Sequence, residues 1–231
     1  MRFRAPRRLS PFAPGVVALA TLLVLAGCSL SSGNASATPI TGAGASTTEN
    51  RTAGAFTSIS ASAGVNLVVS SGDARSVKVT AQPNILPLVR TEIVNGQLTA
   101  TIVAPGASGT KPITVAVVVP TLASLSLDGS ATGTMELETD MLAITLNGGA
   151  TLQAIGTVSH LALTAQGGAV AKLGDMVTDS VTVTMGGGSQ ATLNVKAAIT
   201  GSADGGATIT LTTRPGSMTV KTSGGATVTG G

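Results

Sequence analysis

A few charged side chains have the types and spacing to do chemistry. His160 is the only histidine of the 231 residues. A catalytic histidine needs a partner that orients it, and the sequence suggests none, so we expect His160 to face solvent. Glu136, Glu138 and Asp140 alternate along one predicted strand and share a face, where their carboxylates could bind Ca²⁺. Calcium-binding β-rolls, however, repeat Gly-Gly-x-Gly-x-Asp in every coil, a pattern absent here. We therefore expect a solvated strand edge and no metal site.

Polar residues also precede six recurring small-residue pairs: Asp128, Asn147, Gln166, Asp204 and Ser223, with Gly186 in the remaining place. If the repeats stack, these side chains form a row that could be a hydrogen-bonded ladder or line a shallow ligand groove. Asp, Asn and Ser side chains commonly bond to their own backbone at turns. We therefore expect this row to serve the turns.

Cys28 is the only cysteine and follows a segment with the features of an export signal. Four arginines precede an apolar run over residues 15–26 that ends in small residues, the order expected of a secretory signal. This run is too short to cross a bilayer as a helix. The tetrapeptide Leu25-Ala26-Gly27-Cys28 resembles the lipobox of bacterial lipoproteins. It predicts removal of residues 1–27 and a covalent lipid on Cys28, with no other cofactor.

These features predict an exported, lipid-anchored cell-envelope protein. Ser29 follows the cysteine, which in a Gram-negative host resembles the pattern sent to the outer membrane; otherwise the anchor would lie in the cell membrane. Residues 29–52 are nearly all small or polar, so we expect residues 28–52 to form a lipidated, flexible tether. Residues 53–231 then form one domain.

The composition excludes several classes of function. After Cys28 the chain has nine Lys or Arg against ten Asp or Glu, a net charge of −1, so clustered basic charge for binding nucleic acid is missing. Phe56 is the only aromatic residue beyond the signal segment, which removes the stacking platform used to bind sugars or bases. We therefore expect no nucleic-acid partner and no enzyme activity.

The second half of the domain repeats itself about every 19 residues. Each repeat has a pair of small residues whose first member is a glycine, and we expect these glycines to form the structural turns: Gly129, Gly148, Gly167, Gly187, Gly205 and Gly224. Before each pair, alternate positions are apolar, as in a strand with one buried face. A fixed period of this length, with strands in register, predicts a β-solenoid whose glycine pairs lie at corners.

Before Ala123 the repeat is indistinct and only strand-like runs remain: 59–70, 76–81, 88–94, 97–103 and 113–119. Asn95-Gly96 is a tight-hairpin signal between two of them. We interpret this part as an N-terminal β cap, since terminal units of a solenoid are atypical. At the other end, Lys221 is the only charge in the last stretch. That edge is predicted to be adhesive, so that it self-associates or binds a partner strand.

Four segments together resemble the auto-transporter adhesin head domain, or GIN domain, a family without an established activity. They are Phe56-Thr57-Ser58-Ile59, Asn95-Gly96-Gln97-Leu98, Val119-Pro120-Thr121-Leu122 and Leu125 to Ser130. The resemblance covers residues 54–231. It implies a right-handed parallel β-helix in a bacterial surface or periplasmic lipoprotein. This sequence has Gly-Gly-Ala at corners where the family more often has Gly-Ser-Gly.

Two functional hypotheses follow. The first is a non-enzymatic, lipid-anchored envelope protein whose solenoid surface serves adhesion, contact with another envelope or surface protein, or scaffolding. The alternative is a polysaccharide-binding or polysaccharide-active β-helix. The sequence feature that would favour the alternative is an acid, a base and an aromatic ring on one face, and no such group is evident.

Overall fold

The computed structural model describes residues 39–104 and 106–231. Apart from one short 3₁₀ turn, the elements in these ranges are strands, so the predicted all-β class is confirmed. In chain order they are β1 (Thr47–Arg51), β2 (Ser58–Ala61), β3 (Asn66–Ser71), β4 (Ser76–Ala81), η1 (Leu86–Leu88), β5 (Val89–Val94), β6 (Gln97–Ile102), β7 (Thr114–Val119), β8 (Ser124–Leu127), β9 (Thr132–Leu146), β10 (Thr151–Ala165), β11 (Val170–Met185), β12 (Gln190–Ala203), β13 (Thr208–Leu211), β14 (Ser217–Thr222) and β15 (Thr227–Gly230).

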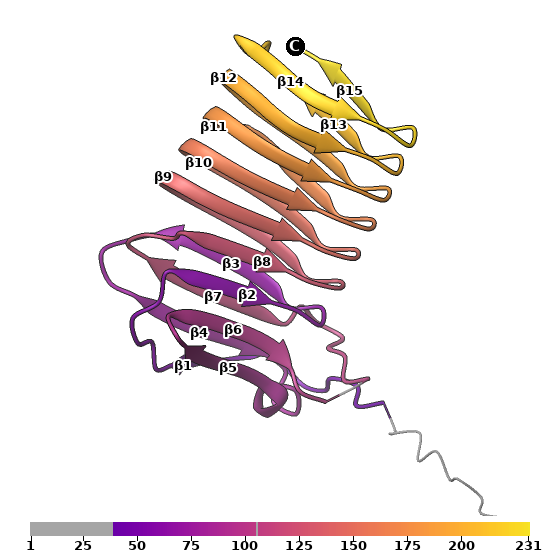
Figure 1. Cartoon of the computed structure of the whole chain (residues 1–231). Coiled ribbons are helices and arrows are strands. Elements are labelled where there is room, and N and C mark those ends of the chain that lie inside the picture. The colour runs from indigo at the N-terminus through magenta and orange to yellow at the C-terminus, as the bar shows by residue number, and fades with distance from the viewer. Residues whose placement is uncertain (1–38, 105) are drawn as a thin grey trace, which may run out of the picture. The chain divides into compact units, whose positions relative to one another are not determined.

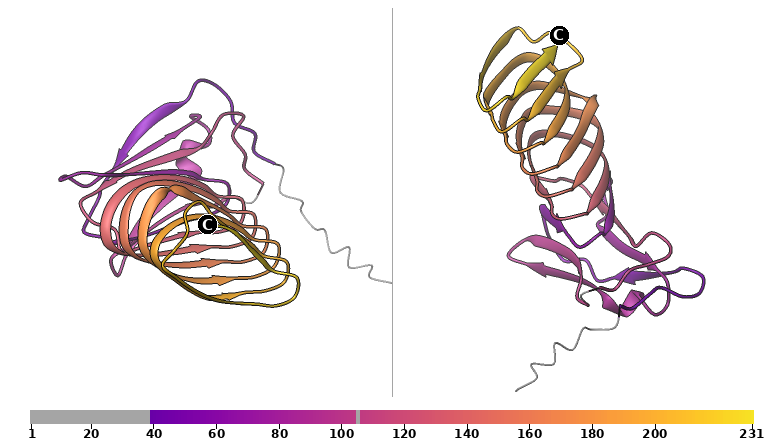
Figure 2. Two further views of the ribbon diagram at one scale, coloured as in Figure 1. Left: turned by 90° about the horizontal axis from the view of Figure 1, so that it is seen from above. Right: turned by 90° about the vertical axis from the view of Figure 1, so that its right-hand side faces the viewer.

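The long strands β9 to β12 stack in parallel as successive coils of a β-solenoid, as the 19-residue period predicted (Figure 1). Each long strand bends and so runs along both flat faces of its coil. The left view of Figure 2 looks down the stack of coils. We call face A the sheet of β1, β4, β7, β3, the first halves of β9 to β12, β13 and β15. Face B contains β5, β6, β2, β8, the second halves of β9 to β12, and β14.

Aliphatic ladders fill the space between the faces. Leu146 pairs in register with Ala165, which pairs with Met185, and all three are buried. Each inward side chain stacks on one of similar type in the next coil, about 4.8 Å away. A single coil therefore cannot bury its inner face without its neighbours. Every buried residue of the core belongs to the compact unit 37–231, which therefore has a core of its own.

The predicted turn glycines lie where the chain passes from face B to face A. Their φ angles lie between +60° and +73°, a range that L side chains rarely adopt. The Gly168 N–H donates to the Gly148 oxygen one coil below at 2.7 Å, and Gly149 bonds Gly129 in the same way. The corner backbones therefore stack as closely as the strands, which leaves little room for a Cβ.

The cap contains a coil that the sequence analysis did not separate. The run 59–70 is divided into β2 and β3 by a turn in which Ala63 and Gly64 have φ of +59° and +76°. This coil is stacked out of sequence order: β2 lies between β6 and β8, and β3 lies between β7 and β9. The stacked coils therefore begin well before Ala123.

The prediction of a flexible tether over residues 28–52 is wrong for residues 40–51, which bond to the cap. Strand β1 pairs antiparallel with β4 at the cap end of face A. Before it, the Gly42 N–H donates to the Ser108 oxygen at 2.8 Å. Gln82, only 2% exposed, donates from Nε2 to the Gly44 oxygen at 3.1 Å, and its Oε1 accepts from the Thr110 N–H at 2.8 Å. These bonds attach the segment to the cap.

Within the described ranges, no helix is long and apolar enough to cross a membrane.

Candidate functional site

The lipobox tetrapeptide lies outside the described residues. The structure therefore says nothing about Leu25, Ala26, Gly27 or Cys28, and lipidation of Cys28 stays a prediction from the sequence.

The three acidic candidates remain separate carboxylates at the surface. Glu136, Glu138 and Asp140 are all exposed, the first two on face A and Asp140 near the bend of β9. Among residues 39–104 and 106–231, no group of three or more His, Cys, Asp or Glu side chains is placed to hold a metal ion.

His160 is exposed, and its Nδ1 lies 2.6 Å from the Ser180 Oγ. The contact follows from the register, in which His160 on β10 pairs with Ser180 on β11. Sequence reasoning missed it, although the 20-residue spacing of the two side chains is one coil length. No carboxylate in the described part of the chain hydrogen-bonds this imidazole or forms an ion pair with it. A general base oriented by an acid is therefore not assembled here.

Among the described residues, the polar row at the corners forms a hydrogen-bonded ladder only at the end nearest the cap. Asn147 Nδ2 donates to Asp128 Oδ1 at 2.8 Å, and the Ser126 hydroxyl donates to the other Asp128 oxygen at 3.1 Å. Further along, a Cβ at Gly186 would lie 2.3 Å from Gln166 Oε1 and 3.0 Å from an Asp204 oxygen. Those two side chains thus fill the space that the glycine leaves, and the row forms no open groove at Gly186.

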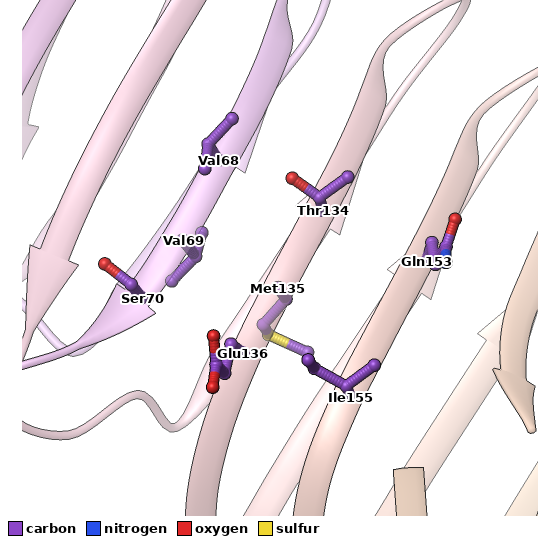
Figure 3. A pocket seen from close by; sticks show the side chains of 8 residues that line it. All are labelled: Val68, Val69, Ser70, Thr134, Met135, Glu136, Gln153 and Ile155. Carbon is purple, nitrogen blue, oxygen red and sulfur yellow. The ribbon is translucent and has the colours of Figure 1, made fainter. Parts of the chain in front are cut away.

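A shallow groove on face A is a concave candidate site. Its first section has a volume of about 290 Å³ and lies across β3, β9 and β10 (Figure 3). Two ridges of outward side chains border it. One consists of Val68, Thr134 and Gln153, and the other consists of Ser70, Glu136 and Ile155.

A second concavity on face A, of about 700 Å³, lies across later coils and also has Gln153 in its lining, so we call it the second section of the groove. The lining there is hydrogen-bonding: Lys172, Asp175, Thr192, Asn194, Thr212 and Thr213. Gly174 lines this section, where a Cβ would approach two threonine methyls at 3.1 and 3.2 Å. The second section thus offers both hydrogen-bond donors and acceptors, whereas the first section includes the apolar Val68 and Ile155. Such a lining suits an extended polar chain better than a compact apolar ligand.

A second candidate surface is the last coil, formed by β14 and β15. Met218 pairs with the fully buried Ile199 of the coil below, yet Met218 itself is 57% exposed. Val220 and Val228 occupy corresponding inward positions and are half-buried. Apolar groups that the other coils bury are therefore accessible here.

Comparison with solved structures finds the same fold in bacterial proteins of low sequence identity. A "putative adhesin" from Bacteroides fragilis NCTC 9343 is 18% identical, with a TM-score of 0.64 over 83% of this chain and 99% of the other. A "putative lipid binding protein" from Parabacteroides distasonis ATCC 8503 is 14% identical, with a TM-score of 0.51 over 84% of this chain and 100% of the other. No curated protein gives a significant match.

One family profile, described as "Putative auto-transporter adhesin, head GIN domain", matches residues 55–215. This match covers more than half of the chain, and the Bacteroides structure supports the same solenoid fold. The chain therefore belongs to the auto-transporter adhesin head GIN-domain family.

Proposed function

We propose that this chain is a lipid-anchored, non-enzymatic cell-envelope protein whose β-solenoid serves adhesion, protein contact or scaffolding. Membership of an adhesin-like family suggests an exported or surface protein. The export signal and the tetrapeptide ending in Cys28 support the finer proposal of a lipid anchor.

The observation that carries the proposal is the attachment of residues 40–51 to the cap. The segment enters the domain beside β4 and β7, at the end of the stack opposite the last coil (Figures 1 and 2). Face A orders its strands from β1 to β15 with nine spacings between them, or roughly 43 Å at about 4.8 Å each. A solenoid attached in this way presents its last coil far from the attachment point.

A short connection to the lipid would keep the cap near the membrane. Pro39 follows Cys28 by only eleven positions. A chain of that length spans at most about 36–40 Å. The cap would thus lie near the bilayer.

The anchor is tested by fractionating cells that express the full chain or its Cys28→Ser variant. The variant should leave the membrane fraction, because no thiol remains to carry the lipid. Ser32→Ala, which changes a nearby hydroxyl outside the tetrapeptide, is the matched control and should stay in the membrane fraction. Membrane association that is equal in all three proteins would contradict the proposal.

The face A groove favours a second candidate, binding of a linear polysaccharide. Gln153 borders both sections and offers an amide donor and an acceptor toward a hydroxylated chain. Gln153→Leu should weaken the binding of neutral, unbranched oligosaccharides by about tenfold, as expected for one lost hydrogen bond. Thr182→Val, an exposed position on face B, should have no effect. Calorimetric titration measures both, and the absence of any saturable binding would reject this candidate.

A further inference from the structure

We propose that the last coil, residues 217–230, is a docking surface for the last coil of a second copy, which gives a closed, tail-to-tail dimer. The family match ends at residue 215, so this coil lies outside it. The inference goes beyond the proposed function and does not depend on the lipid anchor.

The first support is the exposed end of the aliphatic ladders. Met218 continues a ladder in which Val181 pairs with Ile199 and Ile199 pairs with Met218. The two lower members are at most 2% exposed, whereas Met218 is 57% exposed. A second coil placed on this end would bury Met218, Val220 and Val228 as every other coil buries its neighbour. The surface therefore has the apolar character of the interface between two coils.

The second support is the set of peptide groups on the outer edges of β14 and β15. Within the described residues, β14 pairs only with β12, and β15 pairs only with β13. The Ser223 N–H donates to the Ala203 oxygen, and the Thr227 N–H donates to the Ala207 oxygen. Peptide groups alternate in direction along a strand, so those of Met218, Val220 and Val228 point to the unpaired side. Both faces thus end in strand edges that can accept a partner strand.

Charge favours another last coil over the cap end of a second copy. The two outer strands of the cap carry charges of both signs: Glu49 and Arg51 on β1, and Arg90 and Glu92 on β5, each pair forming a salt bridge. Such charges protect a strand edge from pairing. By contrast, Lys221 is the only charged residue of the last coil. An edge with a single charge is more compatible with a second edge of equally low charge than with the charged cap end, and the last coil of a second copy supplies such an edge.

A two-fold axis through Thr219 would bury the apolar groups, pair the free strand edges and keep the charged side chains apart. It makes β14 antiparallel to its copy and places Met218 opposite Val220 of the second molecule, with both side chains facing the core. Their peptide groups then form hydrogen-bonded pairs. Lys221 lies opposite Ser217, so the two lysines do not meet. The interface is isologous and closes at two copies.

The proposal is tested by sedimentation of the unit 37–231, which has its own core, over a range of concentrations. The mass should double and then stay constant. Val220→Pro should remain monomeric, because it removes an N–H that only the second copy would use, and proline is tolerated at such an edge. Thr182→Lys adds a charge at an exposed face B position two coils away and should dimerise like the parent.

Circular dichroism of Val220→Pro should match that of the parent, which separates loss of dimer from loss of fold. If the variant unfolds, Val228→Lys replaces it, with the same expectation of a monomer. A parent that stays monomeric, or that grows beyond two copies, would overturn the proposal. So would a dimer that survives both substitutions in folded protein.

Discussion

The corner glycines offer a quantitative test of the solenoid, and Gly167→Val is the most informative substitution. Gly167 has φ of +73°, and a Cβ there would lie 3.2 Å from the Gly148 oxygen. That oxygen accepts the 2.7 Å hydrogen bond from the Gly168 N–H, which ties two corners together. A valine would thus strain its own backbone and push against the acceptor of this bond.

The expected loss of stability follows from these two effects. A β-branched residue at such a φ costs about 1–3 kcal/mol, and loss of the corner hydrogen bond costs about 0.5–1.5 kcal/mol. Together they lower the free energy of unfolding by about 1.5–4.5 kcal/mol. For a domain of this size, the melting temperature should fall by roughly 3–18 °C.

Thermal unfolding of the unit 37–231 followed by circular dichroism measures this effect. The control is Thr164→Val, a nearly isosteric change at an outward strand position, where the hydroxyl makes no hydrogen bond in the described structure. Its melting temperature should lie within about 2 °C of the parent, since a surface change typically costs no more than about 0.5 kcal/mol. Equal melting temperatures for the two variants would refute the role assigned to the corner.

Three further predictions concern other positions in the domain. Gly201→Ala should destabilise the unit at least as much as Gly167→Val, because a Cβ at this φ of +134° would lie 1.8 Å from the Val183 oxygen; the same melting experiment checks it. Gly96→Ala should cost only about 1 kcal/mol, measured by urea unfolding, because its φ is +75° but no atom lies within 4 Å. Gln82→Leu should release residues 40–51 and speed tryptic cleavage after Arg51, whereas an unchanged cleavage rate would show that other contacts hold the segment.

The stacked part of the fold could be predicted because the sequence repeats with the same period as the stacked coils. Leu127, Leu146 and Ala165 recur at 19-residue intervals, and the structure pairs them in that order. Asn95-Gly96 likewise predicted the β5–β6 hairpin, whose turn has φ of +50° and +75° at these residues. In both cases the signal is local or strictly periodic, so one chain suffices to detect it.

The cap coil could not be predicted in the same way, because its neighbours in space are not its neighbours in sequence. β2 pairs with β6 and β8, which follow it after 35 and 62 intervening residues. Its corner has Ala63-Gly64 in place of a glycine pair, so the repeat is not recognisable. The attachment of residues 40–51 was missed for a related reason. Small and polar residues suggested a flexible chain, but their backbone bonds to β4, Gln82 and Ser108, which are distant in sequence.

Of the two candidate surfaces, the sequence predicted the last coil and did not predict the face A groove. The sequence predicted an adhesive edge at the last coil, because Met218 and Val220 follow the inward pattern and only Lys221 is charged. The face A groove was not predicted, since its residues come from the first halves of the coils, where the outward positions differ from one coil to the next. Gln153, which borders both sections, carries no sequence signal that would single it out.

The most direct test of the account is a cross-linking experiment on the membrane-bound full chain. Thr219→Cys places a thiol on the proposed two-fold axis, where opposite Cα atoms of a non-hydrogen-bonded antiparallel pair are about 4.5 Å apart, within the range of a disulfide. Mild oxidation of the membrane fraction should give covalent dimers from Thr219→Cys and none from Thr182→Cys. Absence of the dimer from membrane-bound Thr219→Cys, or equal yields from both variants, would contradict an anchored solenoid that meets a second copy through its last coil.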